Sequence, residues 1–217
     1  MYEVKKVFLF LTIICIVTCI YININHAGIK ESTSTQTKNP VVTVVFSNDK
    51  TIKIELYPDK APNTVNNFIY LINHHFYDNL PISKIVPGYI IQMGDPIGDS
   101  TGFPGYFIKS ECKNSSIRKP LKHTKGVVSM CRGKEYHTEG SQLFILLTDD
   151  PSLDGRYTSF GKVVEGMDVL EDIGNPINTN HSMKKDILIK NMYVETFGIH
   201  YDEPEIISIR EKLNSNY

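Results

Sequence analysis

The chain has 217 residues, which is long enough for one domain of ordinary size with terminal extensions. Hydrophobic residues make up 41% and charged residues 22%, a balance typical of a globular protein that excludes disorder over most of the length. The 23 Lys and Arg residues nearly balance the 24 Asp and Glu residues, so the net charge is -1. Without a positive field, nucleic acid is excluded as an expected partner.

The chain opens with an apolar segment. Residues 7–22 carry no charge and follow Lys5 and Lys6, a pattern typical of targeting segments. As a helix this run would span about 24 Å, short of the roughly 30 Å hydrocarbon core but longer than many signal-peptide apolar regions. We interpret residues 1–28 as a signal peptide or a signal-anchor, with a buried core helix as the alternative. The expected location is the secretory pathway: the endoplasmic reticulum lumen, the exterior or a membrane, contacted only through this segment.

A polar stretch separates this segment from the predicted domain. Residues 29–40 (IKESTSTQTKNP) are rich in Ser, Thr and Lys and are predicted to be a linker. Residues 41–46, the polar stretch 47–50 and residues 51–56, in which apolar and charged residues alternate, then predict a hairpin with one buried face. A helix is predicted next, with Asp59 as its cap, Pro62 in its first turn and its end near His74.

The rest of the chain predicts a mainly β fold. Short strands are expected at residues 89–93, 126–130, 142–147 and 160–164, then a second helix near 167–173 and a closing strand at 187–195. Many short strands with two helices favour a closed antiparallel β-barrel capped by two α-helices. We assign residues 41–197 to this domain. Residues 198–217 form a polar C-terminal extension, which we expect to be frayed or loosely docked.

Four sequence blocks carry the candidate chemistry, and they follow one another in order and spacing. They are residues 82–95 (ISKIVPGYIIQMGD), 121–130 (LKHTKGVVSM), 140–145 (GSQLFI) and 153–167 (LDGRYTSFGKVVEGM). Together they are similar to the signature blocks of cyclophilins, which are β-barrel peptidyl-prolyl cis/trans isomerases. The resemblance extends from about residue 41 to about residue 197. It implies proline-containing peptides or unfolded proteins as partners and a role in assisting protein folding.

The resemblance also implies catalytic residues. Rotation about an X-Pro bond faces a barrier near 20 kcal/mol, and in the twisted transition state the proline nitrogen regains a lone pair. A cationic donor aimed at that nitrogen therefore lowers the barrier. The family uses an arginine there. This chain has Lys84 at that position, preceded by Ser83 and Ile82 at the family's histidine and aromatic positions. Gln92 matches the glutamine that braces the cation and bonds the substrate backbone.

Lysine keeps the charge but lacks the planar fork of arginine, so reduced activity is expected. The alternative is a non-catalytic module that keeps the pocket for binding proline peptides or acting as a chaperone. The remaining substrate-binding positions implied by the resemblance are Ser83, Tyr89, Ile90, Cys131, Arg132, Gln142, Phe144, Leu153 and Tyr157. Apolar members of this set suit a flat pyrrolidine ring.

Two positions on the pocket rim predict altered selectivity. Arg132 is bulkier and charged where the family has small or polar residues, so it favours acidic residues flanking the proline; a solvated loop arginine is the alternative. Ser152 and Tyr157 replace a tryptophan and a histidine of the family. Because the tryptophan supplies a donor and an apolar wall, we expect cyclosporin-type ligands to bind more weakly than to a standard cyclophilin.

No cofactor and no metal are expected. His74 and His75 are adjacent on the first predicted helix and face different directions, which disfavours a shared metal. Cys112 and Cys131 could form one disulfide in an oxidising compartment, yet buried free thiols are equally compatible with the sequence. Asn114 and Asn180 begin glycan acceptor tripeptides. The composition shows no oligomer signature, so we expect a monomer.

Overall fold

The computed structural model describes residues 38–113, 120–175 and 187–214. Eight strands form one sheet in the order β3-β4-β7-β6-β8-β2-β1-β9, and every pairing is antiparallel. The sheet strands are β1 (Val41–Phe46), β2 (Thr51–Leu56), β3 (Lys84–Val86), β4 (Ile90–Met93), β6 (Val127–Met130), β7 (Leu143–Leu146), β8 (Ser159–Glu165) and β9 (Ile189–Glu195). The other elements are α2 (Pro62–Asn73), β5 (Tyr106–Phe107), a 3-10 turn (Pro151–Leu153), α3 (Met167–Gly174), β10 (Ile207–Ser208) and α4 (Ile209–Asn214).

The sheet curls around a core supplied by the alternating strand positions. In β1 and β2, Val42, Val44, Ile52 and Ile54 are at most 1% exposed and point into this core, as the alternation predicts. Phe160 stands at its centre and packs edge-to-face on a ring of α2. The mainly β prediction is confirmed. The bounds of β1 and β2 match the predicted hairpin residue for residue.

The predicted full closure of the barrel is overstated. The edge strands β3 and β9 do not pair with each other along their length. The two edges meet through the segment before β3, where Pro81 forms a single bridge with Leu188 and Asn79 donates to the carbonyl of Ile189 at 2.7 Å. Proline lacks an N–H, so it cannot extend a ladder at this point. The result is a curled sheet whose two edges touch briefly.

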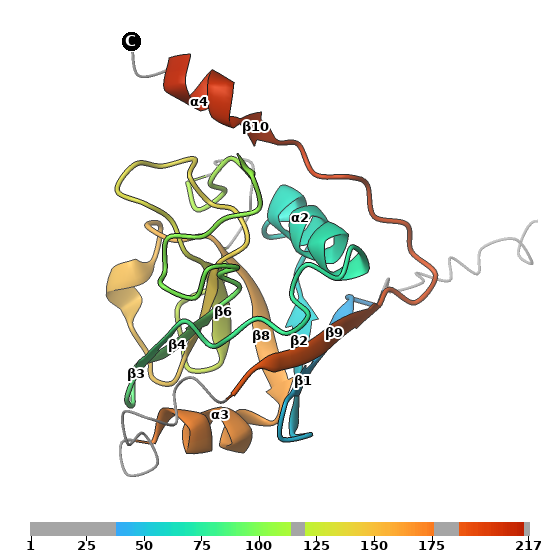
Figure 1. Cartoon of the computed structure of the whole chain (residues 1–217), viewed down its shortest axis with the longest axis vertical. Coiled ribbons are helices and arrows are strands. Elements are labelled where there is room, and N and C mark those ends of the chain that lie inside the picture. Colours follow the sequence, from blue (N-terminus) through green and yellow to red (C-terminus); the bar gives the residue numbers. More distant parts are fainter. Residues whose placement is uncertain (1–37, 114–119, 176–186, 215–217) are drawn as a thin grey trace, which may run out of the picture. The chain divides into compact units, whose positions relative to one another are not determined.

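Helices α2 and α3 lie at opposite ends of the curled sheet (Figure 1). The predicted cap of α2 is wrong: the N-cap is Ala61, which has no side chain to accept a hydrogen bond, and not Asp59. The backbone N–H groups of the first turn, which have no partner within the helix, instead bond to a carboxylate from a distant part of the sequence. Glu111 accepts from the backbone N–H of Asn63 at 3.2 Å and from that of Thr64 at 2.8 Å. A negative charge at this end also suits the helix dipole.

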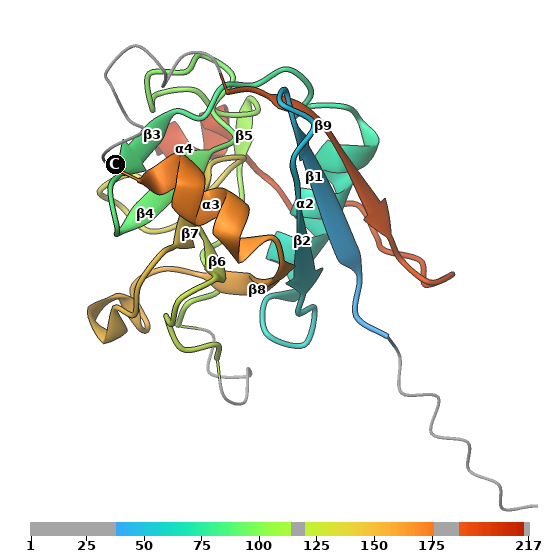
Figure 2. The same ribbon diagram turned by 90° about the horizontal axis from the view of Figure 1, so that it is seen from below.

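The C-terminal extension is docked, whereas the sequence favoured a frayed or loosely docked segment. After β9 the chain crosses the domain, as Figure 1 and Figure 2 show in red. Its strand β10 pairs with β5, in the register Ile207 to Phe107 and Ser208 to Tyr106. Its helix α4 follows directly. The extension therefore adds a second, two-stranded sheet to the domain.

Candidate functional site

A surface cavity of about 640 Å³ lies beside strands β3, β4 and β7, at the loops that follow β6 and precede β8. Ten of the eleven residues that the sequence predicted for the site line it. They are Lys84, Tyr89, Ile90, Gln92, Cys131, Arg132, Gln142, Phe144, Leu153 and Tyr157. The exception is Ser83, which is not among the lining residues; its hydroxyl donates to the carbonyl of Gln92 at 3.2 Å, so it supports the strand pair.

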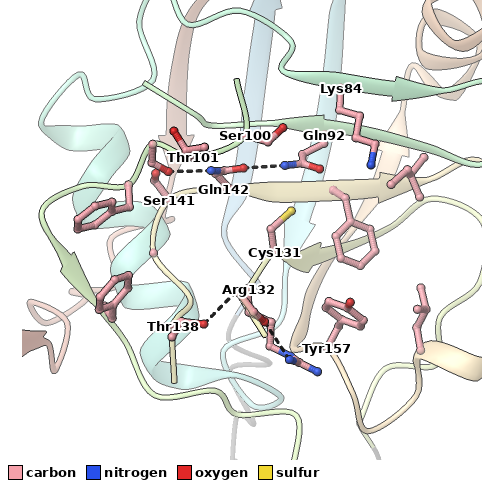
Figure 3. Close-up of a pocket in the computed structure, with 18 of the residues that line it drawn as sticks. Lys84, Gln92, Ser100, Thr101, Cys131, Arg132, Thr138, Ser141, Gln142 and Tyr157 are labelled. Atoms are coloured by element: carbon pink, nitrogen blue, oxygen red, sulfur yellow. Dashed lines mark hydrogen bonds between the residues drawn. The ribbon is translucent and has the colours of Figure 1, made fainter. Parts of the chain in front are cut away.

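Lys84 and Gln92 occupy opposite positions in the β3–β4 pair. Directly opposed residues project from the same face of a sheet with their Cβ atoms about 5 Å apart. Lys84 is exposed at the cavity mouth. Gln92 is held by an amide relay, because its Nε2 donates to Gln142 Oε1 at 2.6 Å and Gln142 Nε2 donates to the carbonyl of Gly102 at 2.7 Å. Figure 3 shows this relay, with the Gln92 oxygen on the side nearer Lys84.

One wall of the cavity is apolar. Phe144 is 5% exposed and packs edge-to-face against Tyr157, with ring centroids 5.5 Å apart. Ile90 and Leu153 pack against the same cluster. Tyr89 completes this wall and donates its hydroxyl to Asp150 at 2.6 Å, a bond that raises the tyrosine pKa. These side chains form a surface suited to a small flat ring such as that of proline.

Arg132 lies on the rim opposite Lys84 (Figure 3). Its Nε donates to the carbonyl of Arg156 at 3.0 Å, and its Nη1 donates to those of Gly133 and Lys134 at 3.1 Å each. The guanidinium lies 4.2 Å from the ring centre of Tyr136 and 4.9 Å from that of Tyr157. Three backbone carbonyls and two tyrosine rings therefore hold this side chain at the rim.

The cavity has an outer compartment that the sequence analysis missed. It is lined by Ser100, Thr101, Gly102, Phe103, Phe107, Gly133, Thr138, Gly140 and Ser141. Phe103 and Phe107 stack with centroids 5.0 Å apart and an interplanar angle of 15°. Most of these residues come from irregular loops, where no periodic pattern marks a site. Gly140 and Ser141 begin the block of residues 140–145, so the sequence could have indicated these two as lining residues.

The fully buried carboxylate of Asp95 shapes this compartment. It accepts from the backbone N–H groups of Ile97 and Gly102, each at 2.9 Å, and of Ser100. Three such bonds fold the loop into a compact turn. A Cβ at Gly102 would collide with the Asp95 side chain, so the close approach requires glycine. The loop thus presents Ser100 and Phe103 to the cavity in fixed positions.

Cys112 and Cys131 are free thiols. Burial raises the pKa of both, which disfavours the reactive thiolate. For Cys131 the positive charge of Lys84 opposes that shift, which places the ammonium within electrostatic reach of the cavity floor. The cysteine therefore contributes a small apolar surface between the two cations, as Figure 3 shows.

A second cluster resembles a nucleophilic triad but cannot act as one. Ser129 Oγ lies 3.0 Å from His123 Nε2, and His123 Nδ1 lies 2.9 Å from Asp154 Oδ1. Ser129 is fully buried and His123 is 1% exposed, so no substrate can reach the hydroxyl. The cluster ties β6 to the loop before it and to the turn after residue 153. Its role is structural.

Several predictions fall outside the described residues, namely the N-terminal segment, Asn114 and Asn180. Among the helices that the structure describes, none is long and apolar enough to cross a membrane. Within the same ranges, no group of three or more His, Cys, Asp or Glu side chains could hold a metal ion. His74 bonds to the carbonyl of Tyr70, and His75 to Asp78.

Comparison with known proteins gives consistent matches. Residues 41–194 match the family described as cyclophilin type peptidyl-prolyl cis-trans isomerase/CLD. Peptidyl-prolyl cis-trans isomerase B of Bacillus subtilis is 43% identical over 125 residues, covering 57% of this chain and 83% of the relative. A peptidyl-prolyl cis-trans isomerase of Helicobacter pylori is 39% identical over 132 residues, covering 59% of this chain and 77% of the relative.

A similar solved structure is a cyclophilin type peptidyl-prolyl cis-trans isomerase of Cryptosporidium parvum, determined in the presence of the dipeptide Ala-Pro. Its TM-score is 0.62 at 30% sequence identity, and the match covers 71% of this chain and 98% of the other. The likeness therefore includes nearly the whole of that chain and leaves part of this one unmatched.

Proposed function

The chain belongs to the cyclophilin-type peptidyl-prolyl cis-trans isomerase family, and from this we propose that it isomerises X-Pro bonds in secretory-pathway proteins at reduced rate, with Lys84 as the catalytic cation. The observation that carries the proposal is the placement of Lys84 and Gln92 on one face of the β3–β4 pair, beside the apolar wall of the cavity. An Ala-Pro dipeptide accompanies the similar structure from Cryptosporidium parvum, which supports proline-containing peptides as ligands.

The proposed mechanism is electrostatic. The proline ring packs against Phe144 and its neighbours while the peptide bond twists. The Lys84 ammonium then stabilises the lone pair that develops on the proline nitrogen, and the braced Gln92 amide bonds the adjacent backbone. No covalent intermediate is required, because the barrier arises from lost amide resonance. A single ammonium offers no planar fork, which is the physical reason for reduced activity.

A protease-coupled isomerisation assay on an Ala-Pro peptide tests this function. We expect the full chain to exceed the thermal rate, and Lys84→Ala to lower that excess by about 10² because a preorganised charge is lost. Lys109→Ala, which removes an exposed lysine that does not line the cavity, is the matched control. If parent and Lys84→Ala both run at the thermal rate while the peptide still binds, the domain is a non-catalytic peptide-binding module.

Arg132 supports a substrate preference for acidic residues next to the proline. Its three bonds to carbonyls use three of the five guanidinium donors, and within the described residues no carboxylate forms an ion pair with it. The lining residues include Lys84 and Arg132 but no Asp or Glu. The cavity mouth is therefore expected to attract a carboxylate.

We expect kcat/KM for peptides with Glu beside the proline to exceed that for Gln peptides by about three- to tenfold, and Arg132→Gln to remove the difference. Lys134→Gln removes one charge from the same loop without touching the cavity, so it should leave the ratio intact. Raising the salt concentration should shrink the preference in the parent. Equal ratios in parent and Arg132→Gln would refute the role of Arg132.

The proposed location and ligand response rest on the sequence. Residues 7–22, preceded by two lysines, support entry into the secretory pathway, and protease protection of the chain in microsomes tests this; full digestion without detergent would contradict it. Ser152 in place of a tryptophan supports weak cyclosporin binding, which a titration against Ser152→Trp measures. Equal affinities in that titration would contradict the argument.

A further inference from the structure

The C-terminal extension has a defined local structure. Gly198 turns the chain with φ of +79°, and Tyr201 packs against the main core. Ser208 and Glu211 form a capping box at the start of α4: the backbone N–H of Ser208 donates to Glu211 Oε2 at 2.8 Å, and that of Glu211 donates to Ser208 Oγ at 3.2 Å. These local bonds give the segment a defined shape before any contact with a ligand.

Hydrogen bonds at three places add to the packing of Tyr201 and hold the extension on the domain. Asn63, in the first turn of α2, brackets the backbone of Glu205: Nδ2 donates to its carbonyl at 2.9 Å and Oδ1 accepts from its N–H at 2.7 Å. Strand β10 then pairs with β5. Finally, Lys212 Nζ donates to the carbonyl of Tyr136 at 3.0 Å. The extension thus reaches from α2 to the loop that carries Arg132.

The β10–β5 pairing and the Lys212–Tyr136 hydrogen bond both contact segments that border the outer compartment of the cavity. The β5 residue Phe107 lines it and stacks on Phe103, and β5 has no strand partner other than β10 in the described residues. The neighbouring Tyr106 donates its hydroxyl to Asn67 at 2.8 Å, and Asn67 donates to the carbonyl of the lining residue Gly140 at 2.7 Å. On the other side, the ring of Tyr136 supports Arg132.

We propose that residues 199–214 are a positioning element for the substrate groove, holding β5 so that Phe103 and Phe107 form an aromatic platform for a large apolar side chain near the substrate proline. A two-residue strand on its own is too short to keep its place. On one side, the bridge between Ile108 and Glu139 holds the end of this strand. On the other side, pairing with β10, itself held through the contact of Asn63 with Glu205, supplies the remaining support. This inference rests on the proposed function, and it names peptides with an aromatic residue preceding the proline as favoured ligands.

The test compares the full chain with a chain ending at residue 198, on tetrapeptides with Phe or Gly at each of the two positions before proline. We expect truncation to lower kcat/KM for the better Phe peptide about tenfold through KM, roughly the worth of one aromatic contact, and to change Gly peptides less than twofold. Calorimetric titration of the same peptides should show the same loss in affinity. Equal losses for Phe and Gly peptides, or no loss, would overturn the proposal.

Two point variants of the full chain provide a test that does not depend on the folding of the truncated chain. Ile207→Pro places a residue without an N–H in β10 and should reproduce the selective loss for Phe peptides. Asp202→Ala lies in the same extension, in an exposed pair with His200, and should change neither peptide. If Ile207→Pro behaves as Asp202→Ala does, the extension does not position the groove. If the unmodified chain runs at the thermal rate with Gly peptides, that result contradicts the isomerase function. It leaves the role of the extension testable, because calorimetry still measures the preference for Phe peptides.

Discussion

Lys84→Arg is expected to raise kcat/KM on an Ala-Pro peptide by about tenfold to a few hundredfold over the parent. Arginine would keep the charge of Lys84 and add a planar fork of donors beside Gln92. The side chain at this position is exposed at the cavity mouth, so the longer guanidinium can be accommodated without displacing core residues. The gain should appear in kcat, because the added bond strengthens in the transition state.

The matched control for this prediction is Lys109→Arg, an exposed lysine outside the cavity, which should leave the rate unchanged. Thermal unfolding of each variant checks that the comparison is between folded proteins. A rate for Lys84→Arg at or below the parent would mean that the Gln92–Gln142 relay does not present its oxygen to the cation. In that case reduced activity would have a cause other than the lysine.

Glu139→Gln is expected to make the protein less sensitive to rising pH. Glu139 is fully buried; Oε1 accepts from Thr158 Oγ1 at 2.8 Å, whereas Oε2 has no hydrogen-bond partner among the described groups. Burial raises the pKa of this carboxyl to about 7, against opposing bonds from Thr158 and Ser110; the negative charge of Glu111 adds to the rise and Arg132 opposes it. The folded protein therefore favours the protonated acid.

The sign of the effect follows from the raised pKa. Below the unfolded pKa near 4.5 both states are protonated, and the stabilising contribution is fully present. As the pH rises from about 4.5 the unfolded chain releases the proton first, so the free energy of unfolding falls; the loss reaches about 3 kcal/mol once the pH has passed through the folded pKa of about 7. Glutamine cannot ionise. The variant should therefore be less stable than or equal to the parent at pH 5 and more stable at pH 8.

Urea unfolding of the parent and Glu139→Gln at pH 5 and pH 8 measures this crossover. Glu135→Gln is the matched control, since it removes an exposed carboxyl from the same loop and should shift stability equally at both pH values. A difference between Glu139→Gln and the parent that stays constant from pH 5 to pH 8 would contradict the raised pKa. Because Glu139 precedes the lining residue Gly140, the same titration is expected to loosen the cavity rim.

Where the local pattern and the tertiary environment agreed, prediction from the sequence was accurate. The two strands of the hairpin at residues 41–56 were predicted to the residue, because the apolar residues of 51–56 alternate with charged ones and place one face in the core. Strands β4, β6 and β7 were predicted within one or two residues. Ten of the eleven candidate site residues line the cavity, because they lie in sequence blocks on these strands and their adjoining turns.

Where distant segments meet, prediction was wrong or silent. The first-turn N–H groups of α2 bond to Glu111, 47 residues beyond Thr64, so the nearby Asp59 was a misleading signal. The closure of the sheet depends on whether β3 and β9 can pair. The effect of Pro81 on that pairing cannot be predicted from the sequence, because it depends on where the two edges meet in the fold. Phe103 stands in an irregular loop that Asp95 shapes, and it stacks on Phe107 of the two-residue strand β5.

A mainly β fold and the residue types at the candidate site, a lysine opposite a glutamine beside apolar side chains, could be predicted from the sequence, because each depends on residue type at a regular or recognisable spacing. The contacts of Arg132 with two tyrosine rings, the burial of Glu139 and the docking of the C-terminal extension could not, because each depends on segments that are distant in the sequence. The helix that Ser208 and Glu211 cap was not predicted from the sequence, although the spacing of the two residues is that of a capping box. The pairing of β10 with β5 was not predicted either, since β10 offers two residues and no periodic pattern.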